Sequence, residues 1–414
     1  MMLTRRSVAV GSAALATSAL VLGPEAVAAP RRRRKTSDEG GQVVLDWEQV
    51  TFDTVYGPFG TTPPLTPIPL GAPVLGFVSL TMYDAACRSA HLGSSSESAA
   101  VAQAAHDVLL NYYPAQASGL QTALDKSLDA IGPGHARSKG VRIGAESAGD
   151  YLRSRAGDGF NDSSIHYSKP PIAPYWQPAA VGGDMLGAWL GSLRNLVVEP
   201  EPIAGPYTLG SSAWVDDYEE VRAVGSVGST VRTPAQTATA LFHNTTNAAM
   251  TLGGSMIRYF GTHPHGILET AHVFAMMHGA LADSLICAWQ QKRDVGFWRP
   301  FQAISGLPDD GNPLTTPQPG WAPLVPNPPY SDYLSGHGSA TSPQIEVIRR
   351  VFGENTALDL RSPTLGTRTY AHLSEIEHEA FHARIWGGLH YRQAMTDAYT
   401  MGHRTAVRVM AALP

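Results

Sequence analysis

The feature of this sequence that most restricts its fold is the helical spacing of apolar residues on both sides of long Pro- and Gly-rich segments. From about residue 43 to residue 157, apolar residues recur at intervals of three or four, as on one face of a helix. Two such faces consist of Leu120, Leu124, Leu128 and Ile131, and of Val141, Ala145, Ala148 and Leu152. Residues 157–233 and 308–329 lack any sustained period, which predicts long irregular connections and no sheet.

The second half of the chain is also predicted to be helical. Thr233 followed by Pro234 is typical of a helix start, because Thr can cap the first turn and Pro fits the first helical position. The Pro-free stretch from about Ile267 to Lys292 predicts a long helix, and Ser374 with Glu377 predicts a capping box for a later one. The fold class is therefore all-α.

Length and composition limit the class of protein. With 414 residues, 43% hydrophobic and 16% charged, the chain can bury a large core as one domain or as two fused halves. A formal net charge of −5 gives no broad attraction to nucleic acid or to anionic membranes. Cys87 and Cys287 are too few for a disulfide scaffold, so we interpret them as two buried thiols.

The N-terminus has the features of an export signal. Arg5-Arg6 precedes an Ala-rich apolar stretch that runs to Leu22, and Ala26-Val27-Ala28 is a small-residue cleavage pattern. We predict a twin-arginine signal over residues 1–28 and a polar, flexible linker over residues 29–42. The apolar stretch is too short to span a membrane comfortably, so we expect a secreted or extracytoplasmic protein without a retained membrane helix.

Three short blocks in the second half carry groups suited to binding a dense anion. Lys292 and Arg299 are separated by six residues, and on a continuous helix they would lie about 10 Å apart along the axis. Gly296 and Pro300 indicate that the helix ends here instead, which lets an ammonium and a guanidinium converge.

The second block, Ser335-Gly336-His337, brings together a hydroxyl, an unobstructed backbone N–H and an imidazole. It stands where we expect a helix to begin, and a helix N-terminus binds anions. By itself, this block could also be an ordinary Ser cap beside a Gly-rich turn.

The third block contains Arg384 and His390, which would point about 120° apart on a regular helix. The glycines at 387 and 388 lie between them and can end the helix, so both side chains can face one ligand. Together the blocks supply three cations, two neutral donors and two histidines. They predict an oxyanion pocket in which one imidazole attacks or ligates the central atom and the other moves a proton.

These blocks resemble the vanadium haloperoxidases and the type 2 phosphatidic acid phosphatase superfamily, whose pattern is Lys-x6-Arg-Pro, Pro-Ser-Gly-His and Ser-Arg-x5-His. This chain reads Lys292-x6-Arg299-Pro300, Leu334-Ser335-Gly336-His337 and Ala383-Arg384-x5-His390. The shared order and spacing make the match more specific than any single block. Leu334 and Ala383 depart from the family's Pro and Ser, but neither position supplies a principal anion contact there.

The resemblance implies two four-helix bundles and vanadate as the cofactor. His390 would bond vanadium, His337 would assist peroxide, and the vanadate oxygens would be held by Lys292, Arg299, Ser335, Gly336 and Arg384. Trp289 and Tyr330 resemble residues on the halide side, although ordinary packing would also account for them. The chain would divide into residues 43–232, a bundle with connecting loops, and residues 233–414, a bundle that carries the site.

The implied activity is a peroxidase reaction. Vanadium would act as a Lewis acid that makes bound peroxide electrophilic, and a halide would attack it to give hypohalous acid. The implied partners are hydrogen peroxide, a halide and a small organic substrate, and the protein could form a homodimer.

The alternative with the most similar site is an acid phosphatase, because vanadate mimics the transition state of phosphoryl transfer. In that reaction His390 would attack phosphorus and His337 would protonate the leaving group. The chain length and the additional helical half favour the haloperoxidase. A protein that binds an oxyanion without catalysis is a third option, against which the placement of His337 beside Ser335 argues.

A different class is suggested by His378-Glu379-Ala380-Phe381-His382, a literal HExxH sequence. On a helix this spacing can present two histidines to zinc and a glutamate as a base, as in metallopeptidases. No Glu follows Glu379 in the chain, so the third ligand would have to be His390, Asp397 or His403. This zinc site is therefore incomplete in the sequence.

Overall fold

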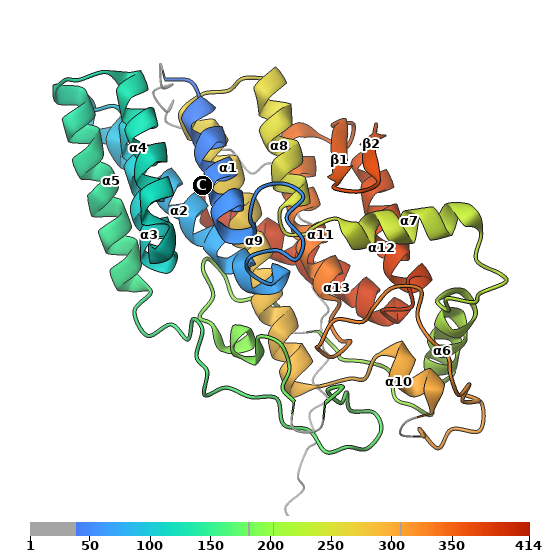
Figure 1. Cartoon of the computed structure of the whole chain (residues 1–414). Coiled ribbons are helices and arrows are strands. Elements are labelled where there is room, and N and C mark those ends of the chain that lie inside the picture. Colours follow the sequence, from blue (N-terminus) through green and yellow to red (C-terminus); the bar gives the residue numbers. More distant parts are fainter. Residues whose placement is uncertain (1–38, 181–182, 202, 307–308) are drawn as a thin grey trace, which may run out of the picture. The chain divides into compact units, whose positions relative to one another are not determined.

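The computed structural model describes residues 39–180, 183–201, 203–306 and 309–414, and these residues are mainly helical (Figure 1). They form thirteen α-helices, two short 3₁₀ helices and one two-stranded hairpin. The predicted all-α fold is confirmed. The predicted export signal at residues 1–28 and all but residues 39–42 of the linker lie outside the described residues.

The first five helices come from the N-terminal part of the chain and pack against one another. They are α1 (Gln42–Tyr56), α2 (Ile68–Leu92), α3 (Glu97–Tyr112), α4 (Ala117–Ile131) and α5 (His135–Ser154). On α4, Leu120 and Leu124 are buried, as their spacing predicts. On α5 the buried face is shifted from the prediction, because Ala145 is exposed and Gly140 and Gly144 are buried instead.

Those two glycines explain the shift on α5. A Cβ atom at Gly140 would lie 2.3 Å from the carbonyl oxygen of Ser96, and one at Gly144 would lie 2.3 Å from that of Ala100. Helix α5 therefore approaches the start of α3 at backbone distance through its smallest residues. A pattern based on large apolar residues cannot detect such a face.

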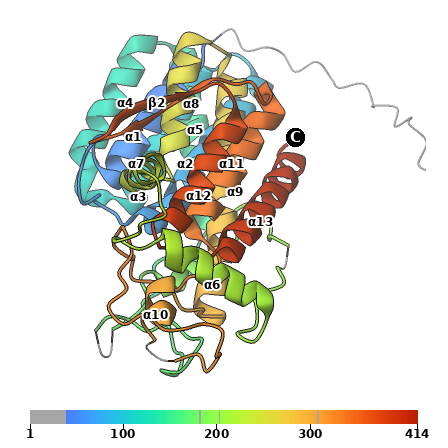
Figure 2. The ribbon, with the colours of Figure 1, turned by 90° about the vertical axis from the view of Figure 1, so that its right-hand side faces the viewer.

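The remaining helices include the ones that carry the predicted site residues. They are α6 (Ser212–Val224), α7 (Pro234–Thr245), α8 (Thr251–Thr262), α9 (Ile267–Asp294), α10 (Pro300–Ser305), α11 (Gly336–Phe352), α12 (Leu373–Trp386) and α13 (Arg392–Ala412). Helix α9 is central and packs against α2, α11 and α13. Figure 2 shows α11 beside α12 and α13.

Two helices, α2 and α9, are long and apolar enough to cross a membrane, but 78% and 94% of their most apolar stretches are buried within the protein. Burial of this extent is expected of core helices. Cys287 of α9 is a buried thiol and Cys87 of α2 is half-buried, and no disulfide joins them.

The predicted helix starts are partly confirmed. Helix α7 begins at Pro234, and Thr233 caps it in a reciprocal box with Gln236. The predicted box of Ser374 and Glu377 is wrong.

Helix α12 already begins at Leu373, and the glutamate that returns to its start is Glu375, which accepts the N–H of His372 at 3.0 Å. Glu377 instead pairs with Arg349 (2.5 Å) and His403 (2.6 Å). These partners come from α11 and α13, so tertiary contacts override the local motif.

The segment between residues 157 and 233 is largely irregular, as predicted, although it contains a 3₁₀ helix (Ala188–Ser192) and α6. Buried Asp283 of α9 fixes it by accepting backbone N–H groups of Leu196, Val197 and Val198 at 2.6, 3.0 and 2.8 Å.

The two strands were not predicted. Strand β1 (Leu358–Ser362) pairs antiparallel with β2 (Gly366–Tyr370), and Leu360 lies opposite Arg368. The burial of β1 alternates residue by residue, which is the pattern of a strand with one covered face. Five residues are too few for this pattern to stand out in the sequence.

Candidate functional site

The predicted site residues converge on one cavity of about 630 Å³. The cavity lies where the C-terminal part of α9, the start of α11 and the end of α12 meet. Its lining includes six of the nine predicted residues: Trp289, Tyr330, Gly336, His337, Arg384 and His390. The other three, Lys292, Arg299 and Ser335, are fully buried directly behind this lining.

Lys292 ends the buried face of α9. Its Nζ donates to the carbonyl oxygens of Ser331 (2.9 Å) and Asp332 (2.8 Å) and lies 5.1 Å from the centre of the Tyr330 ring. Burial and the neighbouring Arg299 lower the pKa of Lys292 well below its usual value. The ammonium has three N–H groups, so these two bonds leave one donor for a ligand.

Two buried guanidinium groups have unused donors. Arg299 donates from Nε to the Tyr330 carbonyl (2.7 Å) and from Nη1 to the Leu389 carbonyl (2.8 Å), with Nη1 3.5 Å from Nε2 of His390. Within the described residues, Nη2 of Arg299 and Nε of Arg384 are buried without a hydrogen-bond partner. Buried donors are rarely left unsatisfied, so these atoms indicate a place for an acceptor-rich ligand.

The order of helix ends explains why these cations meet. Helix α9 ends at Asp294 and α10 begins at Pro300, so Arg299 lies in the predicted break after Lys292. Helix α12 ends at Trp386, and Gly388 has a φ of +74° that turns the chain before His390. Both predicted helix ends are confirmed.

His390 has a buried acidic partner that the sequence analysis missed. Its Nδ1 lies 2.7 Å from Oδ1 of Asp332, which leaves Nε2 as the nitrogen available to a ligand. Burial raises the pKa of Asp332 to about 7, although Arg299 and Lys292 oppose this rise. Burial, Arg299 and Lys292 lower the pKa of His390 well below its usual value.

The start of α11 forms the neutral side of the cavity. Ser335 is the N-cap, and its hydroxyl accepts the N–H of Gly338 at 3.2 Å. A Cβ atom at Gly336 would lie 2.9 Å from the Trp289 ring, so this position requires glycine. The backbone N–H of Ser335 donates to the Ala394 carbonyl (3.2 Å), which ties the start of α11 to α13.

His337 lines the cavity opposite a second missed residue, His243 of α7. The two ring centres are 6.2 Å apart and the rings are nearly perpendicular. Burial lowers the pKa of both histidines, and Arg384 adds to this effect at each of them. Both imidazoles are therefore neutral at pH 7, and His337 can accept a proton.

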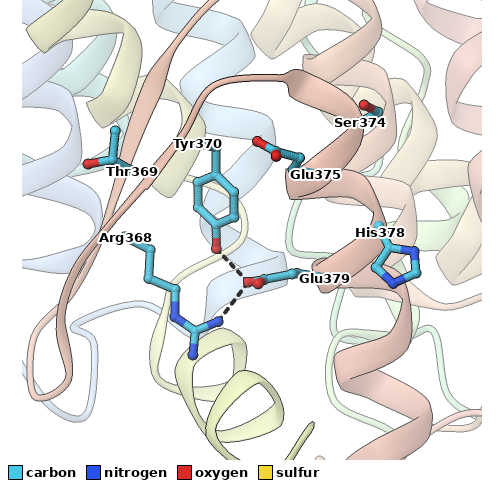
Figure 3. A pocket seen from close by; sticks show the side chains of 7 residues that line it. All are labelled: Arg368, Thr369, Tyr370, Ser374, Glu375, His378 and Glu379. Atoms are coloured by element: carbon cyan, nitrogen blue, oxygen red, sulfur yellow. Dashed lines mark hydrogen bonds and ion pairs between the residues drawn. The ribbon is translucent and has the colours of Figure 1, made fainter. Parts of the chain in front are cut away.

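On its other side, His243 lies near a charged cluster on the surface. Its Nε2 lies 3.5 Å from Oε2 of Glu379. Figure 3 shows that Arg368 and Tyr370 also point to Glu379, and their distances to Oε2 are 2.7 and 2.6 Å. Burial raises the pKa of Glu379, but hydrogen bonds from His243, Tyr370 and Arg368 outweigh this and lower it to about 2. His243 thus connects the cavity to a permanently charged carboxylate.

The HExxH residues do not form a zinc site in the part of the chain that the structure describes. Glu379 faces Arg368 and Tyr370, whereas His378 lies on the other side of α12 (Figure 3). The proposed third ligands are engaged elsewhere: His390 with Asp332, His403 with Glu377, and Asp397 with the Tyr333 hydroxyl. Among the described residues, no group of three or more His, Cys, Asp or Glu side chains is arranged to hold a metal ion.

Comparisons with known proteins give a family-model match and structures of similar fold. Residues 272–413 match the family model of the VCPO second helical-bundle domain. Among solved structures, the chain is similar to the first bacterial vanadium-dependent iodoperoxidase, with 16% identity and a TM-score of 0.73 over 92% of this chain and 99% of that chain.

Two further similar structures are apo and holo forms of bacterial vanadium-dependent chloroperoxidase. The apo form has 15% identity and a TM-score of 0.66 over 84% of this chain and 94% of that chain, and the holo form has 15% and 0.67 over 91% and 98%. No curated protein sequence matches. At these identities the structural likeness shows the shared fold. The family-model match covers residues 272–413, and the similar structures share the fold over most of the chain.

Proposed function

We propose that this protein is a vanadium-dependent haloperoxidase that uses hydrogen peroxide to oxidise a halide. The observation that carries this proposal is the pair of buried, unpartnered donors, Nη2 of Arg299 and Nε of Arg384. These donors occur beside a cavity that His390 also lines, and Nε2 of His390 is available there to a ligand. Three cations and two histidines around one small space fit a tetrahedral oxyanion such as vanadate.

In this proposal Lys292, Arg299 and Arg384 hold vanadate oxygens, with the Ser335 hydroxyl and the Gly336 N–H as neutral donors. His390 is the vanadium ligand, and Asp332 fixes its tautomer and ring orientation. Bound vanadate supplies a Lewis acid that makes peroxide electrophilic toward a halide.

His337 is the acid–base residue in this proposal. Its pKa lies well below the usual value, so at pH 7 it is a neutral base that can take a proton from hydrogen peroxide. Trp289 and Tyr330 form the aromatic wall that we assign to the halide side. Trp289 donates its indole N–H to the Leu186 carbonyl (3.0 Å), so it offers the ligand only its ring.

The test uses the mature chain, which begins at Ala29. This start follows from our proposal that the protein is exported by a signal over residues 1–28. The metal-free protein is assayed with peroxide and chloride, bromide or iodide, with and without orthovanadate. It is also assayed with p-nitrophenyl phosphate without vanadate. We expect halide oxidation that requires vanadate and disappears in His390→Ala, while His378→Ala, a matched change on the outer side of α12, keeps full activity.

Other outcomes separate the alternatives. Phosphate hydrolysis without halide oxidation would mean that the same pocket serves an acid phosphatase. Zinc-dependent peptide cleavage that disappears in His378→Ala, without halide oxidation, would instead support a metallopeptidase. Circular dichroism of both variants confirms that each histidine change leaves the helical fold intact.

A further inference from the structure

A second cavity of about 510 Å³ adjoins the oxyanion cavity. The two cavities share four lining residues: Pro64, Ile68, Asn244 and Thr246. None of the predicted vanadate-binding residues lines the second cavity. Its volume is in the range of small-molecule sites, so it can hold a molecule that reaches toward the first cavity.

One side of this second cavity is aromatic and aliphatic. Phe52 and Tyr56 come from the end of α1, Phe59 from the loop after it, and Met250 from the start of α8. The Tyr56 hydroxyl donates to the Ile68 carbonyl (2.8 Å) and Tyr56 is almost fully buried, so it supports this wall and leaves no unused hydroxyl donor. Phe59 is 56% exposed, which leaves its ring open to a ligand.

The other side carries two arginines that form no ion pair among the described residues, although Asp359 lies close enough to oppose the lowering of the Arg258 pKa by burial. Arg258 of α8 donates from Nη2 to Ser255 Oγ (3.1 Å) and to the Asp359 carbonyl, and its Nε is buried without a partner. Arg361 of the hairpin is exposed and close enough to Arg258 to repel its charge. In the described residues, neither guanidinium lies within ion-pair distance of a carboxylate side chain. Two cations arranged in this way favour an anionic group between them.

We propose that the second cavity binds the organic substrate, and that this substrate is an electron-rich aromatic carboxylate. The ring would lie on Phe59, which is open to the cavity in front of the buried Phe52 and Tyr56, and the carboxylate would lie on Arg258 and Arg361. The shared residues would bring the ring beside the place where the halide is oxidised. This inference rests on the proposed haloperoxidase function.

The chemistry balances with the reagents of that function. Halide, hydrogen peroxide and a proton give hypohalous acid and water. The aromatic ring then attacks the halogen of hypohalous acid, a carbon–halogen bond forms, and the oxygen–halogen bond breaks. The ring loses a proton that combines with the released hydroxide to form water, so the products are the aryl halide and water.

The test compares 4-hydroxyphenylacetate with its neutral analogue 4-hydroxyphenylacetamide. Binding of each to the metal-free protein is measured by calorimetry, which requires no vanadate. We expect the carboxylate to bind more tightly than the amide. Arg361→Gln should weaken carboxylate binding by about 10-fold, as for one lost charge-assisted hydrogen bond, and leave amide binding unchanged. Arg258→Gln should do the same, and Arg142→Gln, an exposed arginine on α5, is the matched control.

The second readout is the vanadate-loaded enzyme. Competition between the two phenols with bromide should favour the carboxylate in the wild type and lose this preference in Arg361→Gln, while iodide oxidation to triiodide stays unchanged in the variant. Because Arg361 is exposed, its replacement removes no core contact. Equal halogenation of both phenols, or equal binding of the carboxylate by wild type and variants, would overturn the inference. Absence of triiodide formation with arginine-dependent binding intact would instead contradict the proposed function and support the cavity assignment.

Discussion

At the scale of single residues, Asp332 is the group on which the geometry of His390 depends. Replacing it with Asn keeps the size of the side chain but removes the carboxylate charge, leaving Nδ1 of His390 with a neutral amide in place of its acidic partner. We expect Asp332→Asn to weaken vanadate binding by about 10- to 100-fold, as for other partners of ligating histidines. Calorimetric titration of metal-free protein with orthovanadate measures the change directly.

Asp397→Asn is the control for Asp332→Asn. Asp397 is also partly buried and also accepts a side-chain hydrogen bond, at 2.9 Å from the Tyr333 hydroxyl, but it does not contact His390. Equal vanadate affinity of Asp332→Asn and wild type would show that Asp332 does not position the histidine.

Replacing His243 should change kcat and vanadate affinity differently. His243 lies beside His337, and in the described residues it forms no hydrogen bond with the cations that would hold vanadate oxygens, so His243→Gln should leave vanadate affinity nearly unchanged. We expect kcat to fall by about 10-fold, because His337 loses the imidazole that lies between it and Glu379. The pH profile of kcat should also shift, because His243 helps to lower the pKa of His337.

A purely structural His243 would give a different pattern. The variant would lose stability and vanadate affinity together, with the pH profile of the remaining activity unchanged.

At the scale of elements, the site depends on how closely α13 approaches α11. A Cβ atom at Gly402 would lie 2.1 Å from Ser342 Oγ and 2.8 Å from Pro343 Cδ. We expect Gly402→Ala to reduce the free energy of unfolding by about 1–3 kcal/mol, because the two helices must move apart. Urea denaturation of variant and wild type in the same buffer measures the difference.

Gly119→Ala is the matched helix control. Gly119 is exposed on α4 with open space where a Cβ atom would be, so alanine should stabilise the protein by about 0.5–1 kcal/mol. A Gly402→Ala variant as stable as Gly119→Ala would contradict the close packing of α11 and α13.

The helices also show which parts of the structure are predictable from the sequence. Helix ends depend on local chemistry, so the starts at Pro234 and Gly336 and the turn at Gly388 were found from Thr, Ser and Gly alone. The buried face of α5 was found only at Ala148, because Gly140 and Gly144, which pack against α3, have no apolar side chain that a sequence pattern could detect.

The site residues also differ in whether the sequence predicts them. Its three motif blocks were found because each is short and continuous. Asp332 lies three residues before Ser335, and an acidic residue so close to the second block was the available signal. His243 had none, since only the packing of α7 brings it to His337.

At the scale of the whole molecule, one fully buried polar cluster links α1, α2 and α9. Ser79 Oγ lies 2.7 Å from Oε1 of Glu48 and 2.8 Å from Nδ1 of His278, and Oε2 of Glu48 lies 3.3 Å from the same nitrogen. Burial raises the pKa of Glu48 to about 8 and lowers the pKa of His278 to about 3. Both groups are therefore neutral in the folded protein at pH 7, and the cluster joins helices from the two halves of the chain without a net charge.

This cluster predicts how stability depends on pH. Between pH 4.5 and 8 the unfolded chain releases the Glu48 proton while the folded protein keeps it, so the Glu48 contribution to stability falls as pH rises. Glu48→Gln keeps a neutral side chain of the same size and removes this fall. The variant should gain stability relative to wild type from pH 5 to pH 8, by at most about 1.4 kcal/mol per pH unit. Glu146→Gln, an exposed change on α5, should follow the wild-type curve, and a Glu48→Gln curve parallel to it would show that Glu48 is ionised in the fold.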